Sequence, residues 1–170
     1  MSDLNIEAMF ELKPITKEGI PRALEKVERY RLLNEPAEAE SICRDILKVE
    51  PTHQKALVLL ILTLSDQFNK ISSKEAETLL PKLTDGYQRA YYTGIVMERL
   101  AKAALNRGTP GSDHDAYEWL EEALEAFEKA SGIRPAGNDD AILRWNTCVR
   151  TIESHRLAPR AKEYHGPVLE

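Results

Sequence analysis

An interval that occurs twice is the feature that most constrains the fold of this chain. Ala39 is followed twelve positions later by Pro51, and Ala123 is followed at the same distance by Pro135. Each alanine lies in a run of apolar residues with helical period, and a proline ends such a helix because it cannot donate a hydrogen bond to the preceding turn. The two intervals therefore indicate a helical unit that the chain uses more than once.

Apolar residues recur at helical spacing in seven segments, separated by short stretches rich in turn-forming residues. No segment shows the alternation that is typical of a β-strand. The chain is therefore predicted to be all-α, an array of antiparallel helix pairs in which the seventh helix covers the apolar face of the last pair. The predicted helices comprise residues 17–33 or 21–33, 36–49, 53–68, 74–84, 87–106, 115–131 and 138–156.

Proline, glycine and asparagine give these helices their predicted ends. Asn34 is suited to the left-handed conformation that stops a helix, and Pro36 is suited to the first position of the next one. Pro81 should kink or shorten the fourth helix, because it removes a backbone donor. Gly86 is predicted to be a helix stop, and Gly132 is predicted to form a glycine C-cap closed by the apolar residue behind it.

Together with their neighbours, these residues resemble the tetratricopeptide repeat (TPR) family, whose pattern W-x2-L-G-x2-Y…A-x3-F…P extends over about 34 residues. The matching residues are Tyr30, Ala39 and Pro51 in the first helix pair and Ala123, Phe127 and Pro135 in the last. The resemblance implies a TPR-like right-handed superhelix of about three degenerate helix-turn-helix repeats with a C-terminal capping helix. The middle pair departs from the pattern, because Ala39 and Ala123 are 84 residues apart, which is not a whole number of repeats. We expect the extra residues in the fifth helix and in the loop at 108–112.

The predicted organisation is an N-terminal arm (1–16), a TPR-like helical-repeat domain (17–156) and a C-terminal tail (157–170). A net charge of −5 argues against a nucleic-acid partner, which would require a basic surface. The longest apolar stretch, 56–62, is too short to span a bilayer, and the first residues lack the basic and apolar regions of a secretory signal. We therefore expect a cytoplasmic protein without membrane contact, in which Cys43 and Cys148 are buried thiols.

Catalytic and cofactor-binding motifs are missing from the sequence, which has no Gly-rich phosphate loop, no G-x-S-x-G and no C-x-x-C. The four histidines lie far apart, and none has a second histidine four positions away with which to share a metal ion. The cluster 112–115, which includes His114, is interpreted as a helix N-terminus. The chain is thus predicted not to be an enzyme and to use no cofactor or metal, with a metal-dependent enzyme as the remote alternative.

Basic residues gather near the C-terminus, and the sixth helix carries an acidic stripe. The basic residues are Arg144, Arg150, Arg156, Arg160 and Lys162. They could form a patch for an acidic partner segment, or they could be ordinary surface with some internal pairing, and we favour the second interpretation.

In the TPR family, the first helix of each pair lines a concave groove that receives a peptide, so the resemblance implies such a groove here. The chaperone-binding members hold a terminal carboxylate with a basic and Asn-containing clamp, whereas Leu24 and Glu28 occupy the corresponding positions in this chain. An apolar floor is expected instead, within a charged margin. The floor would consist of Leu24, Val58 and Leu62, and the margin of Glu28, Arg31, Lys55, Arg99 and Lys102. The competing interpretation is that the apolar third helix belongs only to the core.

The sequence therefore predicts a non-catalytic protein–protein interaction adaptor or scaffold that binds a protein or peptide segment, as a monomer or homodimer. Binding would come from the release of water at apolar groove residues, while charges would set the orientation of the ligand. The alternative is a self-assembling structural subunit, a homo-oligomer whose interface would include Tyr91, Tyr92 and Ile95 on the fifth helix.

Overall fold

Residues 10–162 are described by the computed structural model, and within this range the chain is helical and contains no strand. The α-helices are α1 (Ile20–Leu32), α2 (Pro36–Val49), α3 (Gln54–Ser65), α4 (Lys74–Leu79), α5 (Gly86–Arg107), α6 (Ser112–Gly132) and α7 (Asp140–His155). Two short 3-10 helices, η1 (Lys17–Gly19) and η2 (Leu80–Lys82), precede α1 and follow α4. The prediction of an all-α chain with about seven helices is confirmed for these residues. Residues 1–9 of the predicted arm and 163–170 of the predicted tail lie outside the described range.

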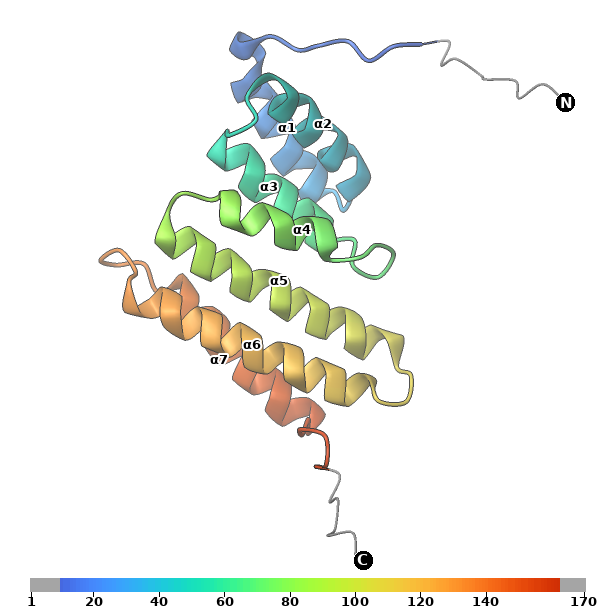
Figure 1. The fold of residues 1–170 in the computed structure, drawn as a ribbon, viewed down its shortest axis with the longest axis vertical. Helices are drawn as coiled ribbons and strands as arrows, with labels where there is room; N and C mark the ends of the chain where they lie inside the picture. Colours follow the sequence, from blue (N-terminus) through green and yellow to red (C-terminus); the bar gives the residue numbers. More distant parts are fainter. Residues whose placement is uncertain (1–9, 163–170) are drawn as a thin grey trace, which may run out of the picture.

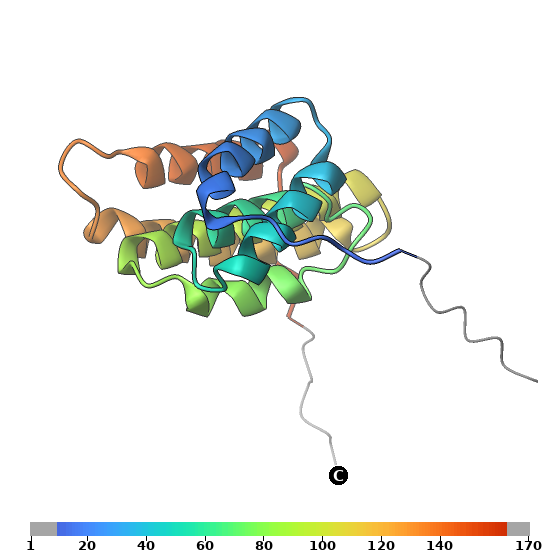
Figure 2. The ribbon, with the colours of Figure 1, turned by 90° about the horizontal axis from the view of Figure 1, so that it is seen from above.

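The helices are stacked along the long axis of the molecule, with α1 and α2 at one end and α6 and α7 at the other (Figure 1). Each predicted pair is in contact, namely α1 with α2, α3 with α4, and α5 with α6, and the last contact is the most extensive. In addition, α7 packs on α6, and α3 contacts α1, α2 and α5. Seen from above, α1 and α7 lie on the same side of the stack and α4 lies on the opposite side (Figure 2).

A first core, which we term the N-terminal core, joins α1 to α4 and is centred on α3. Residues 56–61 and 64 of this helix are all buried. Val27 on α1 and Cys43 and Ile46 on α2 are fully enclosed against it. A helix that is apolar on all sides must be covered on all sides, and this requirement explains the four helical neighbours of α3. No helix in the described part of the chain is long and apolar enough to cross a bilayer.

A second core, the C-terminal core, joins α5, α6 and α7 and is rich in small residues. Its buried alanines are Ala90, Ala101, Ala104, Ala116, Ala123, Ala130 and Ala141. At Gly94 of α5, a Cβ atom would lie 2.5 Å from a ring carbon of Phe127 on α6, so the phenyl ring occupies the space that a side chain would need. Leu62, Tyr92 and Met97 pack against both cores and connect them.

Several helix ends follow the signals seen in the sequence. Asn34 has φ of 58°, the left-handed conformation expected after the first helix, and Pro36 is the first residue of α2. The predicted shortening at Pro81 is confirmed, because α4 ends at Leu79 and continues only as the 3-10 helix η2. Gly108, with φ of 59°, ends α5.

Other helix ends were predicted wrongly. Gly86 does not stop a helix but begins α5, because the side chain of Asp85 caps this end by accepting a hydrogen bond of 2.8 Å from the backbone N–H three residues later. The sixth helix begins at Ser112, three residues earlier than expected, and the third ends at Ser65 rather than at 68. Gly132 remains within α6, and the residue that follows it has φ of −120°, so no left-handed glycine cap forms there.

Candidate binding groove

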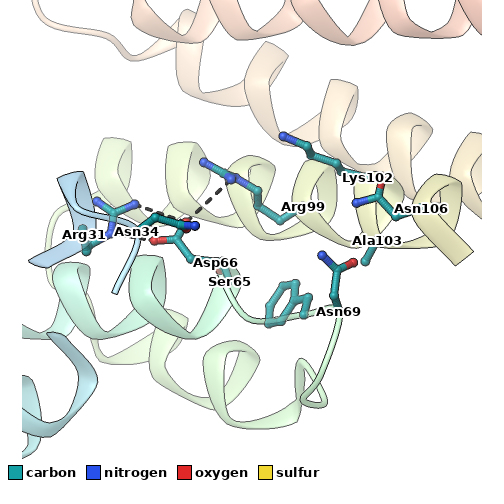
Figure 3. Close-up of a pocket in the computed structure, with 10 residues that line it drawn as sticks. Arg31, Asn34, Ser65, Asp66, Asn69, Arg99, Lys102, Ala103 and Asn106 are labelled. Carbon is teal, nitrogen blue, oxygen red and sulfur yellow. Dashed lines mark hydrogen bonds and ion pairs between the residues drawn. The ribbon is translucent and has the colours of Figure 1, made fainter. Parts of the chain in front are cut away.

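A hollow of about 370 Å³, termed the α3–α5 hollow, lies where the ends of α1 and α3 face the C-terminal half of α5 (Figure 3). Polar side chains predominate in its lining. The lining residues are Arg31, Asn34, Ser65, Asp66, Phe68, Asn69, Arg99, Lys102, Ala103 and Asn106.

A second hollow of about 450 Å³, the α5–α7 hollow, adjoins the first on the side of α5 that faces α7. It is lined by Glu98, Arg99, Ala101, Lys102, Leu105, Asn106, Leu120, Arg144, Thr147, Thr151 and His155. Arg99, Lys102 and Asn106 line both hollows, and we refer to the two together as the inner groove. Apart from Leu120 on α6, its residues come from α1, α3, α5 and α7 and from the turns that follow α1 and α3.

The helical period of α5 explains why three of its residues serve both hollows. Arg99, Lys102 and Asn106 are spaced three and four residues apart, which places them on one side of the helix. Val96 and Ala104 lie on other sides of the same helix and are fully buried in the N-terminal and C-terminal cores. The packing of α5 against both cores thus orients its polar side toward the groove.

Asp66 is the centre of the ion pairs in the α3–α5 hollow. Its carboxylate accepts two hydrogen bonds from Arg31, of 2.8 Å from Nε and 3.4 Å from Nη2. Nη1 of Arg99 lies 3.6 Å from the same carboxylate, which is close enough for an ion pair but too long for a good hydrogen bond. Figure 3 shows both guanidinium groups directed at Asp66, while Lys102 extends from α5 on the same side as Arg99. Two guanidinium groups therefore share one carboxylate, while Lys102 has no such partner among the described residues.

The α5–α7 hollow combines an ion pair at its rim with an apolar floor. Glu98 accepts hydrogen bonds from Arg144, of 2.7 Å from Nη2 and 3.0 Å from Nε, and its side chain is only 14% exposed. Leu105 is half-buried and supplies apolar surface, while Ala101 and Leu120, each 1% exposed, belong to the core beneath it. An apolar floor with a polar rim is the usual composition of a ligand-binding groove.

Three of the eight residues predicted for a peptide groove line the inner groove, namely Arg31, Arg99 and Lys102. Glu28 and Lys55 lie outside both hollows and pair with each other, with 2.9 Å between Oε1 and Nζ. The charged margin expected from the sequence is thus divided between the groove and a separate ion pair that joins α1 to α3.

The predicted apolar floor is buried in the structure. Leu24 and Val58 are each 8% exposed and belong to the N-terminal core, and Leu62 is half-buried between the two cores. None of the three lines either hollow, because neighbouring helices enclose α3. Leu105, which the sequence did not single out, is half-buried and supplies apolar surface in the α5–α7 hollow instead.

Several groove residues were not identified from the sequence. Asn106 could have been found, because it stands four residues after Lys102 and so shares its side of the helix. Asp66 lies in the turn after α3 and Arg144 on α7, and only tertiary packing brings them to α5. No local pattern marks residues of this kind.

The polar cluster at the start of α6 has structural contacts within the chain. Nδ1 of His114 lies 2.9 Å from the carbonyl oxygen of Ala158. Arg160 donates a hydrogen bond of 3.0 Å to Glu118 and also pairs with Asp115, so part of the basic C-terminal region is paired internally. Among residues 10–162, no three His, Cys, Asp or Glu side chains are grouped so that they could hold a metal ion.

The two cysteines and the fifth-helix aromatic residues lie in the interior. Cys43 and Cys148 are fully buried free thiols, and desolvation raises the pKa of each to about 12. A thiol with this pKa is a weak nucleophile at neutral pH because almost none of it is ionised. Tyr91 and Tyr92 are half-buried and Ile95 is buried, so the surface considered for a homo-oligomer is largely enclosed by α5's own neighbours.

No match to this chain was found among protein-family models, curated proteins or solved structures. The inner groove, with its cations, side-chain amides and apolar floor, is the feature of the structure from which a function can be inferred.

Proposed function

We propose that this chain is a non-catalytic protein–protein interaction adaptor, a TPR-like right-handed superhelix that binds a peptide segment in the inner groove. One observation supports the proposal above all: every second helix, from α1 to α7, contributes side chains or its following turn to the same two adjoining hollows. Stacked helix pairs that keep their first helices on one side form an extended concave surface, and solenoid proteins use such surfaces for binding.

The groove has the chemical groups that an extended peptide needs. The side-chain amides of Asn34, Asn69 and Asn106 can donate to and accept from the main chain of a ligand. Leu105, which is half-buried, can release water when an apolar side chain covers it. The two hollows meet across the same stretch of α5, one toward α1 and α3 and the other toward α7, and this arrangement suits an elongated segment better than a compact small molecule. A cytoplasmic setting, in which both thiols stay reduced, accords with this role.

Selection of peptides from a random library displayed on phage would test the proposal. Thr147→Trp places a large ring in the α5–α7 hollow from an exposed position on α7, and it should abolish binding of the selected peptides. Thr78→Trp makes the same change on the exposed side of α4, outside the groove, and should leave binding intact. Thermal unfolding of both variants establishes that each is folded. Peptides that bind both variants as well as the parent protein, or a library without enriched peptides, would contradict the proposal.

Self-assembly is the second candidate, and it is favoured by exposed apolar side chains. Leu32 is 88% exposed at the end of α1, and Leu33 and Leu143 are each 60% exposed. Isolated apolar residues are common on the surfaces of monomers, so this observation weighs less than the groove. Sedimentation over a range of concentrations distinguishes the candidates, because a mass that stays at one chain excludes a homo-oligomer.

A further inference from the structure

The charge of the inner groove is opposite to that of the whole chain. Its lining contains four basic side chains (Arg31, Arg99, Lys102 and Arg144) and two acidic ones (Asp66 and Glu98). With histidine counted as neutral, the groove has an excess of two positive charges on a chain whose net charge is −5. A positive groove on a negative molecule attracts acidic segments and repels basic ones.

The two acids in the groove do not neutralise all of its cations. Asp66 is hydrogen-bonded by Arg31, and Arg99 reaches it only at 3.6 Å, so N–H groups of Arg99 remain available. Glu98 is occupied by Arg144. Lys102 is exposed and forms no ion pair with a carboxylate of the described residues. Arg99 and Lys102 extend from α5 on the same side, so together they can receive a carboxylate from outside the chain (Figure 3).

Neutral donors extend this positive region along the α3–α5 hollow. Asn34 lies at the end near Arg31, and Asn69 and Asn106 lie at the other end (Figure 3). All three are exposed, so their amide N–H groups can donate to a carboxylate as the cations do. More than one acidic side chain of an extended segment could therefore be bound in this hollow.

The adjoining hollow adds an apolar requirement. Leu105 lies half-buried in its floor, three residues after Lys102 on α5, and Lys102 lines both hollows. A carboxylate and an apolar side chain that are neighbours in one peptide would thus meet complementary surfaces at the same time. We infer that the inner groove selects acidic segments that carry an apolar side chain beside their carboxylates. The inference rests on the proposed function, since it names the chemistry of the peptide that the groove would bind.

Reversal of the charge at Lys102 tests this inference. Peptides enriched from the phage library are synthesised with amidated C-termini, so that only side-chain carboxylates contribute, and their affinities are measured by fluorescence anisotropy. The enriched peptides should be acidic with an apolar residue, and Lys102→Glu should weaken their binding about tenfold or more through repulsion of the ligand carboxylates. Lys102→Gln, which removes the cation without adding an anion, should give a smaller loss in the same direction.

Lys129→Glu is the matched control, because it makes the same change in net charge at an exposed lysine of α6 outside the groove. It should leave the affinity unchanged, and an equal loss there would overturn the inference by showing a general effect of net charge. The enriched peptides could instead be neutral or basic, and their binding could be lost in Thr147→Trp but unchanged in Lys102→Glu. That result would overturn the inference of an acidic ligand while leaving the proposed function intact. If Thr147→Trp blocks none of the enriched peptides, the proposed function and this inference both fail.

Discussion

The two cores of this molecule bury apolar surface in different ways. In the N-terminal core, α3 is apolar on all sides, and large aliphatic side chains from neighbouring helices enclose it. In the C-terminal core, alanines and Gly94 allow α5 and α6 to approach closely, and the ring of Phe127 fills the space over the glycine. The first core depends on bulk, and the second depends on the absence of bulk at particular positions.

This difference explains where the groove forms. Because α3 is enclosed, its apolar residues cannot face a ligand. α5 is buried only where it meets the two cores, and its remaining side is free to carry Arg99, Lys102 and Asn106. The polarity of the inner groove therefore comes from the helix that is shared between the cores rather than from the most apolar one.

Loss of bulk at the centre of α3 should have the largest effect. Ile61→Ala removes three carbons from a fully enclosed position and should lower the free energy of unfolding by about 2–5 kcal/mol, through lost burial and the cavity left behind. Urea denaturation measures the change. Leu32→Ala, at a side chain that is 88% exposed, is the control and should change stability by less than about 0.5 kcal/mol. Similar losses for the two variants would mean that α3 is not enclosed as described.

A larger side chain at the contact between α5 and α6 should destabilise the C-terminal core. In Gly94→Ala the new methyl group would meet the ring of Phe127, and we expect a loss of about 1–3 kcal/mol of unfolding free energy in urea denaturation. Gly132→Ala is the matched control, since no atom lies within 4 Å of a Cβ there and the position is helical. Alanine should stabilise that site by up to about 1 kcal/mol, because it loses less backbone entropy than glycine.

A second change can show whether the ring is the cause. Gly94→Ala should cost less in the Phe127→Leu background than in the parent chain, because the smaller side chain leaves room for the methyl group. Equal costs in both backgrounds would assign the loss to the backbone of α5 and would weaken the contrast between the two cores.

The number and order of the helices could be predicted largely from the sequence because their determinants are local. Helical period and the breakers Asn34 and Pro81 gave the number of helices, and α2 was predicted with both of its observed ends. One of the errors occurred where a side-chain cap decides the boundary. Asp85 accepts a backbone hydrogen bond and thereby starts α5 at a glycine that had been taken for a stop.

The groove could be predicted only in part. The TPR resemblance pointed to the first helices of the pairs, and Arg31, Arg99 and Lys102 do line the inner groove. It also assigned the floor to α3, where Val58 proved to be buried. Whether an apolar residue faces a core or a groove depends on which helices pack around it, and the sequence of that residue's own helix does not contain this information.

Each core contains one buried thiol. Alkaline pH should therefore lower the free energy of unfolding through both cores to a similar extent, and by less than the substitutions in α3 and at Gly94. Desolvation raises the pKa of Cys43 and of Cys148 from 9.0 to about 12 in the folded chain. Above about pH 9 the thiols of the unfolded chain ionise while the folded ones stay protonated, so unfolding releases protons and stability falls as pH rises toward 12. At about pH 10 the loss should be about 1 kcal/mol for each thiol.

Single replacements then compare the two cores directly. Cys43→Ala and Cys148→Ala should each remove about half of the thiol contribution to the slope of unfolding free energy against pH, measured by urea denaturation between about pH 8 and 10. Tyr91, whose pKa burial also raises to about 12, should leave a residual slope in the double variant. A slope that depends on Cys43 alone would show that α7 admits water around Cys148. In that case the C-terminal core, with its small residues and its terminal helix, would be the more open of the two.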